Sequence, residues 1–186
     1  DNLNKTYYHF ADNKIFDFLY WLFPKSEVTL YNDKNLNSNY DLFITFGGNT
    51  LTKFSKKRKD FLRFQKDINA INYFINKKKP IVGICYGAQI LANYFKSEII
   101  PKLNHAGTKH YIYNENSKLM VNSYHDYSII KLGKNLSNIA KANDGTYEAF
   151  HNKNKKILGI MWHPERNRFF KDFDRKIIKN FLRNIK

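Results

Sequence analysis

The sequence predicts an α/β fold in which a mostly parallel central sheet is flanked by helices and carries additional antiparallel strands in its C-terminal half. Helix-like and strand-like hydrophobic patterns alternate in the first half of the chain, short strand-like runs follow, and a helix closes the chain. The 186 residues are 42% hydrophobic, and no Gly/Ser-rich or Pro-rich stretch divides them. We therefore expect one domain over residues 1–186.

The spacing of apolar residues sets the expected elements. Helical periodicity predicts helices at residues 10–23, 59–76, 88–95 and 170–185. In the first half of the chain, short apolar runs predict strands at residues 28–31, 41–46 and 81–84. In the second half, similar runs predict strands at residues 111–113, 119–122, 129–131, 139–142, 147–151 and 157–162.

The chain is strongly basic, with 32 Lys and Arg against 16 Asp and Glu, for a formal net charge of +16. Such a charge suits binding to phosphates, so a basic nucleic-acid-binding module is one alternative. However, the lysines are spread along the whole chain, and no helix-turn-helix, zinc-ligand spacing or RNA-binding aromatic signature accompanies them. We therefore expect no nucleic-acid partner.

Two further features bear on location and redox chemistry. No apolar run approaches the roughly 20 residues that cross a bilayer, and the polar start of the sequence has no signal-peptide core, so we expect a soluble cytoplasmic protein with no membrane partner. The single cysteine, Cys85, cannot form an internal disulfide. Its local context must therefore explain it.

Cys85 lies between two glycines, in the order Gly83, Ile84, Cys85, Tyr86, Gly87. This is the spacing of a nucleophile elbow, and it falls between a predicted strand and a predicted helix. The positive end of a helix dipole lowers a thiol pKa, so we expect an exposed, reactive thiolate. The alternative is an inert cysteine that packs as a small apolar residue.

A base and its orienting carboxylate follow a later strand. His163 ends an apolar run, and Glu165 lies two residues further on, so in extended backbone both side chains project to the same side. Glu165 can then orient the imidazole toward the thiol. An oxyanion also needs donors, and we expect the backbone N–H groups of Tyr86 and Gly48 to supply them.

With these motifs in order, the chain resembles the class I glutamine amidotransferase superfamily, and within it the γ-glutamyl hydrolase branch. The stretches that carry the resemblance are residues 46–51, 80–89, 121–125, 144–149 and 162–166. The resemblance implies a flavodoxin-like fold and a triad of Cys85, His163 and Glu165. It also implies cleavage of a γ-glutamyl amide through a γ-glutamyl thioester, with release of glutamate.

The resemblance further implies residues that bind the substrate. Gln89, Asn122, Ser123 and Tyr124 match positions that contact the amino acid end of the glutamyl group, and His125 matches a motif histidine near the site. We expect no cofactor and no metal ion, and we interpret His9, His105, His110 and His151 as structural. The short forms of two motifs are similar to amidohydrolases of bacterial surface-polysaccharide synthesis, including those that act on γ-glutamyl-CDP-amidate.

Two departures from the family pattern stand out. Tyr86 occupies a position where hydrolases of this branch commonly carry Arg. The resemblance therefore does not determine the identity of the leaving group. The family also begins with a strand before its first helix, and we expect that strand to be missing before residue 1. A glutaminase subunit that delivers ammonia to a synthase partner remains an alternative within the same family.

Overall fold

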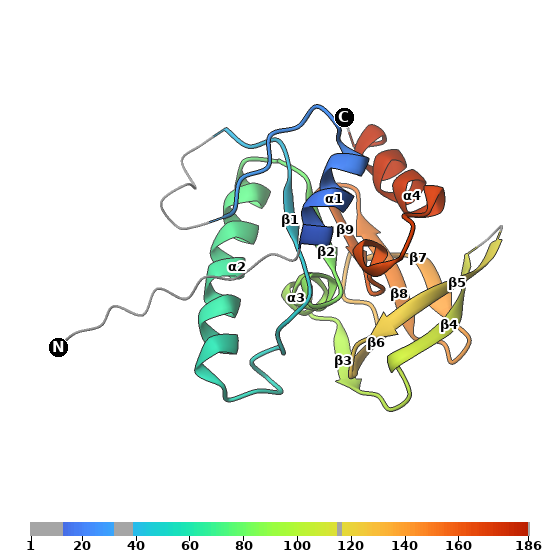
Figure 1. Ribbon diagram of the computed structural model, residues 1–186. Helices are drawn as coiled ribbons and strands as arrows, with labels where there is room; N and C mark the ends of the chain where they lie inside the picture. Colours follow the sequence, from blue (N-terminus) through green and yellow to red (C-terminus); the bar gives the residue numbers. More distant parts are fainter. Residues whose placement is uncertain (1–12, 32–38, 115–116, 186) are drawn as a thin grey trace.

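The computed structural model describes residues 13–31, 39–114 and 117–185 (Figure 1). The helices are α1 (Asn13–Leu22), α2 (Arg58–Asn76), α3 (Tyr86–Tyr94), the 3-10 turn η2 (Pro164–Arg166) and α4 (Asp172–Arg183). The strands are β1 (Phe43–Thr45), β2 (Ile81–Ile84), β3 (Glu98–Pro101), β4 (Ala106–Asn114), β5 (Ser117–Tyr124), β6 (Tyr127–Lys131), β7 (Ser137–Ala142), β8 (Tyr147–Asn152) and β9 (Ile157–Ile160).

All the described strands belong to one sheet with the order β1-β2-β9-β8-β7-β4-β5, and β3 and β6 form a pair attached through β8. β2 lies between β1 and β9 and runs parallel to both. The other neighbouring strands among the described residues are antiparallel. The parallel strands therefore form one end of a mixed sheet, and the antiparallel strands extend it.

Helices cover both faces of the parallel strands, as Figure 1 shows with α2 on one side and α1 and α4 on the other. One apolar cluster joins α2 and α3 to the sheet through residues such as Ile71, Leu91 and Ile81. A second joins α1 and α4 through residues such as Phe18 and Ile178. Because both faces of β2 and β9 are covered, every residue of these two strands is buried. This confirms the predicted α/β class.

The predicted elements agree with the structure except at a few places. Residues 28–31 do not form the predicted strand: they pair with no strand of the described chain, and Leu30 is 57% exposed. β3 was not predicted, because its charged first residue and terminal proline obscure the apolar pattern, yet it pairs with β6. Residues 10–12 of the first predicted helix lie outside the described residues.

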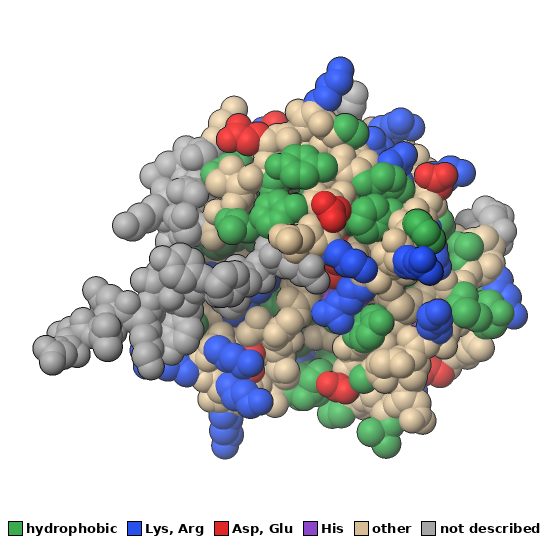
Figure 2. All heavy atoms as spheres, in the orientation of Figure 1, with side chains coloured by type: hydrophobic (Ala, Val, Ile, Leu, Met, Phe, Trp, Pro, Cys, Tyr) green, Lys and Arg blue, Asp and Glu red, His purple; other side chains and the backbone are tan. Residues whose placement is uncertain are grey.

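The structure shows how the basic side chains are distributed on one face and whether any described helix could span a membrane. On the face shown in Figure 2, Lys and Arg side chains form several separate groups with other side chains between them, rather than one continuous stripe. Among the described helices, none combines the length and the apolar character that a bilayer span requires.

A buried hydrogen bond holds α4 against the strand that leads into the candidate site. The indole Nε1 of Trp162 donates to Asp174 Oδ1 at 2.8 Å, and both residues are about 1% exposed. Burial raises the pKa of Asp174 from 3.8 to about 6, although the Trp162 hydrogen bond acts in the opposite direction. The folded chain therefore binds this proton more tightly than the unfolded chain does.

The sign of this shift gives a prediction about stability. Because the folded-state pKa is raised, the contribution of Asp174 is fully present below about pH 4 and is lost as the pH rises to about 6, by on the order of 3 kcal/mol. Asp174→Asn keeps the acceptor for Trp162 and cannot ionise. We expect this variant to lose that component of the pH dependence and to unfold at an equal or higher temperature at pH 7.5.

Thermal unfolding followed by circular dichroism between pH 4 and pH 8 would test this. Asp172→Asn is the matched control, since that carboxylate lies in the same helical turn with 80% of its side chain exposed. A pH profile of Asp174→Asn identical to that of the wild type would contradict the prediction.

Candidate active site

Cys85 occupies the sharp turn between β2 and α3. Its backbone is in the left-handed region, with φ 53° and ψ −106°, which is costly for a residue with a side chain. Hydrogen bonds on both sides hold this conformation: Cys85 N donates to Ile160 O at 2.8 Å, and Gln89 N donates to Cys85 O at 2.9 Å. The geometry is that of the predicted elbow.

The two flanking glycines let α3 pack closely on the parallel strands. A Cβ atom at Gly83 would overlap the carbonyl of Gly87, and a Cβ atom at Gly87 would overlap the carbonyl of Thr45 on β1. A larger residue at either position would move the helix away from the sheet and displace Cys85. The spacing of these glycines is thus required by the packing.

His163 lies just beyond the end of β9, the parallel neighbour of β2. Asn122 holds its backbone at two points, because His163 N donates to Asn122 Oδ1 and Asn122 Nδ2 donates to His163 O, both at 2.8 Å. The ring is held as well: His163 Nδ1 lies 2.6 Å from Glu165 Oε1. His163 and Glu165 are 1% and 4% exposed, so this pair is shielded from water.

The candidate nucleophile and the candidate base both lie close to Gly47. A Cβ atom at Gly47 would lie 3.4 Å from His163 Nε2 and 3.5 Å from the Cys85 Cβ, and it would clash with His163 Cε1 at 2.6 Å. The imidazole and the cysteine therefore border the same small space, with Nε2 on that side and Nδ1 turned toward Glu165. Any side chain at position 47 would fill the gap.

The state of the thiol differs from the expected one. Cys85 is only 7% exposed, and burial raises its pKa to about 12, assisted by the negative charge of Glu165. The hydrogen bond from the backbone N–H of Tyr86 acts in the opposite direction but does not outweigh these effects. The prediction of an exposed thiolate with a lowered pKa is therefore wrong, and Cys85 at rest is a shielded neutral thiol.

The loop after β1 is fixed by Asp60. Its carboxylate accepts hydrogen bonds from Asn49 Nδ2 at 2.7 Å and from Ser55 Oγ at 2.5 Å, and the backbone N–H of Thr50 lies 3.3 Å away. Burial acts to raise the pKa of Asp60, but these hydrogen bonds outweigh it and the pKa is lowered. Asp60 thus remains ionised and anchors the segment that follows Gly47 and Gly48.

The structure gives different information about the two predicted oxyanion donors, Tyr86 and Gly48. The backbone N–H of Tyr86 makes a hydrogen bond with the sulfur of Cys85, and its role as an oxyanion donor stays a prediction. Gly48 has a φ of 108°, which an L-residue rarely adopts, and open space lies where its Cβ would be. Its role as the second donor stays a prediction. The side chain of Tyr86 is 1% exposed and packs in the core.

The predicted substrate-binding residues differ in their exposure and in their contacts. Tyr124 is 46% exposed and its ring lies against that of His163, with 5.6 Å between the centroids. Ser123 is fully buried, and Gln89 Nε2 donates to Tyr127 O at 3.1 Å. The side chain of Asn122 makes two hydrogen bonds with the backbone of His163, which supports a role in positioning that residue. Whether these residues contact substrate stays a prediction.

The structure also shows where His125 and three of the histidines interpreted as structural lie. His125 is 3% exposed and lies next to Glu148, as do His105 and His110. His151 lies on β8 away from that group. His9 lies outside the described residues.

Sequence reasoning missed two residues that shape the site, Gly47 and Asp60. The Gly-Gly pair was the available signal for the first, although it gives no indication of which glycine faces the imidazole. Nothing in the sequence around Asp60 sets it apart from other helical carboxylates.

The fold and this arrangement define a class of protein: an α/β enzyme with a cysteine elbow beside a histidine–glutamate pair. The family model for class I glutamine amidotransferases matches residues 18–185. The chain therefore belongs to the class I glutamine amidotransferase family.

Individual relatives agree with this assignment. The chain is 39% identical to the γ-glutamyl-CDP-amidate hydrolase of Campylobacter jejuni over 147 residues, covering 77% of this chain and 70% of that protein. It is 34% identical to the glutamine-hydrolysing GMP synthase of Caldicellulosiruptor saccharolyticus, over 57% of this chain and 22% of that protein. Its fold matches a glutamine amidotransferase from Thermotoga maritima with a TM-score of 0.58 and 17% identity, covering 87% of this chain and 81% of that one.

The raised thiol pKa gives a prediction about reactivity. Because Cys85 is the only cysteine, alkylation by iodoacetamide reports on this thiol alone. With a pKa of about 12, the thiolate fraction and hence the rate should rise about tenfold per pH unit from about pH 7 to pH 10, without a plateau.

Stopped-time labelling with intact-mass detection would measure these rates, with a small-molecule thiol as the reference and Cys85→Ser as the unlabelled control. A rate that levels off below about pH 8 would contradict the buried neutral thiol and restore the low-pKa thiolate.

Proposed function

We propose that the chain is a cysteine-dependent amidohydrolase that cleaves a γ-glutamyl amide bond, with Cys85, His163 and Glu165 as its catalytic triad. The observation that carries this proposal is the space at Gly47, which is bordered by His163 Nε2 and by Cys85 while His163 Nδ1 is held by Glu165. The general relation of nucleophile, base and orienting carboxylate needs these three groups in this order.

The first half of the reaction forms a thioester. Cys85 Sγ attacks the γ-carbonyl carbon while its proton passes to His163 Nε2, because a neutral thiol needs a base at the moment of attack. The resulting oxyanion accepts hydrogen bonds from the backbone N–H of Tyr86 and, in our proposal, of Gly48. The C–N bond then breaks, and His163 gives its proton to the departing nitrogen.

The second half regenerates the enzyme. His163 takes a proton from water, the resulting hydroxide equivalent attacks the thioester carbon, and the C–S bond breaks as His163 returns the proton to Cys85 Sγ, which leaves glutamate and the free thiol. Glu165 neutralises the imidazolium that forms twice in each cycle without itself taking the proton. Its 2.6 Å contact with His163 Nδ1 also fixes the tautomer in which Nε2 accepts a proton.

For the substrate, we propose a γ-glutamyl amide whose leaving group is nucleotide-linked, as in γ-glutamyl-CDP-amidate. The relative from Campylobacter jejuni carries that activity in its name. In this chain, the exposed ring of Tyr124 lies against His163, and the guanidinium of Arg166 lies 4.8 Å from the centroid of that ring. An exposed aromatic ring and a neighbouring cation suit a nucleotide base and a phosphate, respectively.

A second candidate is a glutaminase subunit that passes ammonia to a synthase. The similarity to part of a glutamine-hydrolysing GMP synthase favours it. Such a subunit should release little glutamate alone and gain activity with its partner, whereas a stand-alone hydrolase needs no activator.

The triad gives a prediction in three variants. We expect Cys85→Ser to abolish glutamate release, His163→Ala to lower kcat by at least about 100-fold, and Glu165→Gln to lower it less, since Glu165 orients the base and does not react. Purified variants would be assayed for glutamate with γ-glutamyl-CDP-amidate and with glutamine, and circular dichroism would check folding. Full activity in Cys85→Ser would exclude the mechanism.

The leaving-group proposal has its own test. Arg166→Gln should lower kcat/KM for γ-glutamyl-CDP-amidate by about tenfold or more, because one charge-assisted hydrogen bond to phosphate is lost. It should change kcat/KM for an uncharged γ-glutamyl anilide much less. Arg168→Gln is the control, since that guanidinium lies over Phe169 instead. Equal losses for both substrates would argue against a phosphate contact at Arg166.

A further inference from the structure

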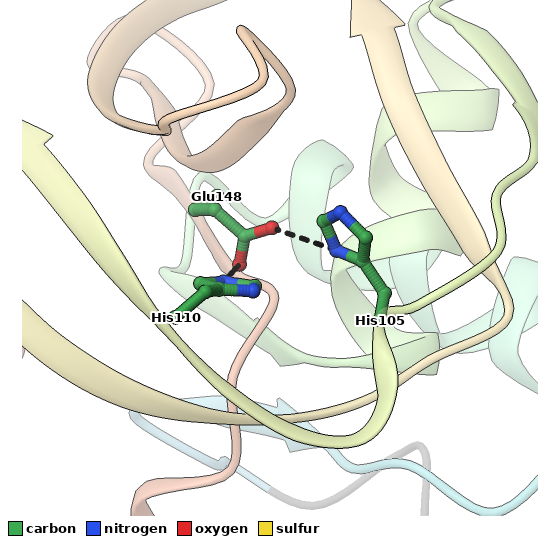
Figure 3. Close-up of side chains that lie close together, drawn as sticks. All are labelled: His105, His110 and Glu148. Atoms are coloured by element: carbon green, nitrogen blue, oxygen red, sulfur yellow. Dashed lines mark ion pairs between the residues drawn. The ribbon is translucent and has the colours of Figure 1, made fainter.

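A second group of chemically capable side chains contains no member of the candidate triad. We call it the His–Glu cluster, and it consists of His105, His110, His125 and Glu148. His105 precedes β4, His110 lies within β4, His125 follows β5 and Glu148 lies on β8. Figure 3 shows the rings of His105 and His110 directed at the Glu148 carboxylate. His105, His125 and Glu148 are 5%, 3% and 0% exposed.

Hydrogen bonds on the outer sides of two rings fix where their lone pairs point. His105 Nε2 lies 2.9 Å from a carboxylate oxygen of Asp144, and His125 Nδ1 lies 3.1 Å from the carbonyl oxygen of Tyr127. Both partners only accept hydrogen bonds, so these two nitrogens carry the hydrogen. In neutral imidazoles, His105 Nδ1 and His125 Nε2 are then acceptors, and both face Glu148 Oε1.

Buried hydrogen-bond acceptors that face one another without a donor between them are unfavourable. His105 Nδ1, His110 Nε2, His125 Nε2 and both carboxylate oxygens of Glu148 are buried and have no hydrogen-bond partner among the residues that the structure describes. Each such polar group costs free energy when it is left without a partner. A cation among these atoms would satisfy all of them together.

The distances between the atoms are long for hydrogen bonds and close to those between the ligands of a metal ion. The nitrogens of His110, His125 and His105 lie 3.4, 3.5 and 3.8 Å from the oxygens of Glu148. In a tetrahedral zinc site with bonds of about 2.0–2.2 Å, neighbouring ligand atoms lie roughly 3.3–3.6 Å apart. The ligand atoms of His105, His110 and Glu148 also all lie within 4.8 Å of one another.

We propose that the His–Glu cluster is a binding site for a zinc-type transition metal ion, with His105 Nδ1, His110 Nε2 and Glu148 as ligands and the fourth position open to water or to His125 Nε2, which lies 3.5 Å from Glu148 Oε1. Imidazole donors favour zinc over magnesium or calcium, which prefer oxygen. The outer hydrogen bonds to Asp144 and Tyr127 are those that orient metal-bound imidazoles in other proteins. This proposal departs from the sequence-based expectation of no metal ion, which stays untested.

The site would join segments that are distant in the sequence. A metal bound to these residues links β4, β8 and the segment after β5, and so cross-links the antiparallel half of the sheet. The backbone carbonyl of Glu148 also accepts a hydrogen bond from Met161 N at 2.8 Å, two residues before His163. Metal binding should therefore stabilise the region that carries the candidate base, independently of any step at Cys85.

Metal content tests this proposal directly. The full chain would be freed of metal by chelation and dialysis, titrated with Zn²⁺, and analysed by mass spectrometry for bound metal. We expect one Zn²⁺ per chain and a higher unfolding temperature with the metal. Substitution by Co²⁺ should give the strong visible bands of a tetrahedral site without a thiolate charge-transfer band, since the single cysteine is not a ligand.

Variants separate the site from adventitious binding. His110→Gln and Glu148→Gln should weaken Zn²⁺ binding by more than about 100-fold, and His110→Gln keeps the test valid if Glu148→Gln fails to fold. His151→Gln, on the same strand as Glu148 but outside the cluster, should bind like the wild type. Absence of stoichiometric Zn²⁺ in the wild type, or equal binding by wild type and His110→Gln, would overturn the proposal.

Discussion

The parallel pairing of β2 with β9 is the interaction on which the candidate site depends. The pairing in register, from Ile81 opposite Ile157 to Ile84 opposite Ile160, brings the carboxyl ends of both strands to the same edge of the sheet. Cys85 leaves the first strand there, and His163 follows the second after a short extension. Because both strands are buried on both faces, the apolar core that stabilises the fold also fixes the distance between the nucleophile and the base.

That same core explains why the thiol is not ionised at rest. The strained turn at Cys85 sets its side chain beside the small space at Gly47 that the His163 imidazole also borders, and only 7% of the residue is exposed. Burial and the charges of Glu165 and Glu148 then favour the neutral form over the influence of the helix N-terminus. The proposed chemistry therefore relies on proton transfer to His163 during attack. A cation at the His–Glu cluster would offset the charge of Glu148.

Features that depend on local sequence were predicted correctly, and features that depend on contacts between distant segments were not. β2 is recovered at its observed bounds because a continuous apolar run lies between Pro80 and Cys85. The elbow and the His163–Glu165 pair are local motifs, so spacing alone indicates them. β3 depends on pairing with β6, and residues 28–31 have strand-like composition without a partner strand in the described chain, so local pattern misleads in both cases. The burial of Cys85 and the convergence of His105, His110 and His125 on Glu148 are tertiary effects that no local spacing encodes.

The central claim is that the sulfur of residue 85 becomes covalently linked to the glutamyl group of the substrate. Rapid acid quenching of the enzyme during turnover of a γ-glutamyl amide, followed by peptide mass spectrometry, measures this directly. The account predicts a mass increase of one glutamyl group on the peptide that contains Cys85, and its loss on incubation with water. Turnover without any adduct on that peptide, or with the adduct on a different residue, would contradict it.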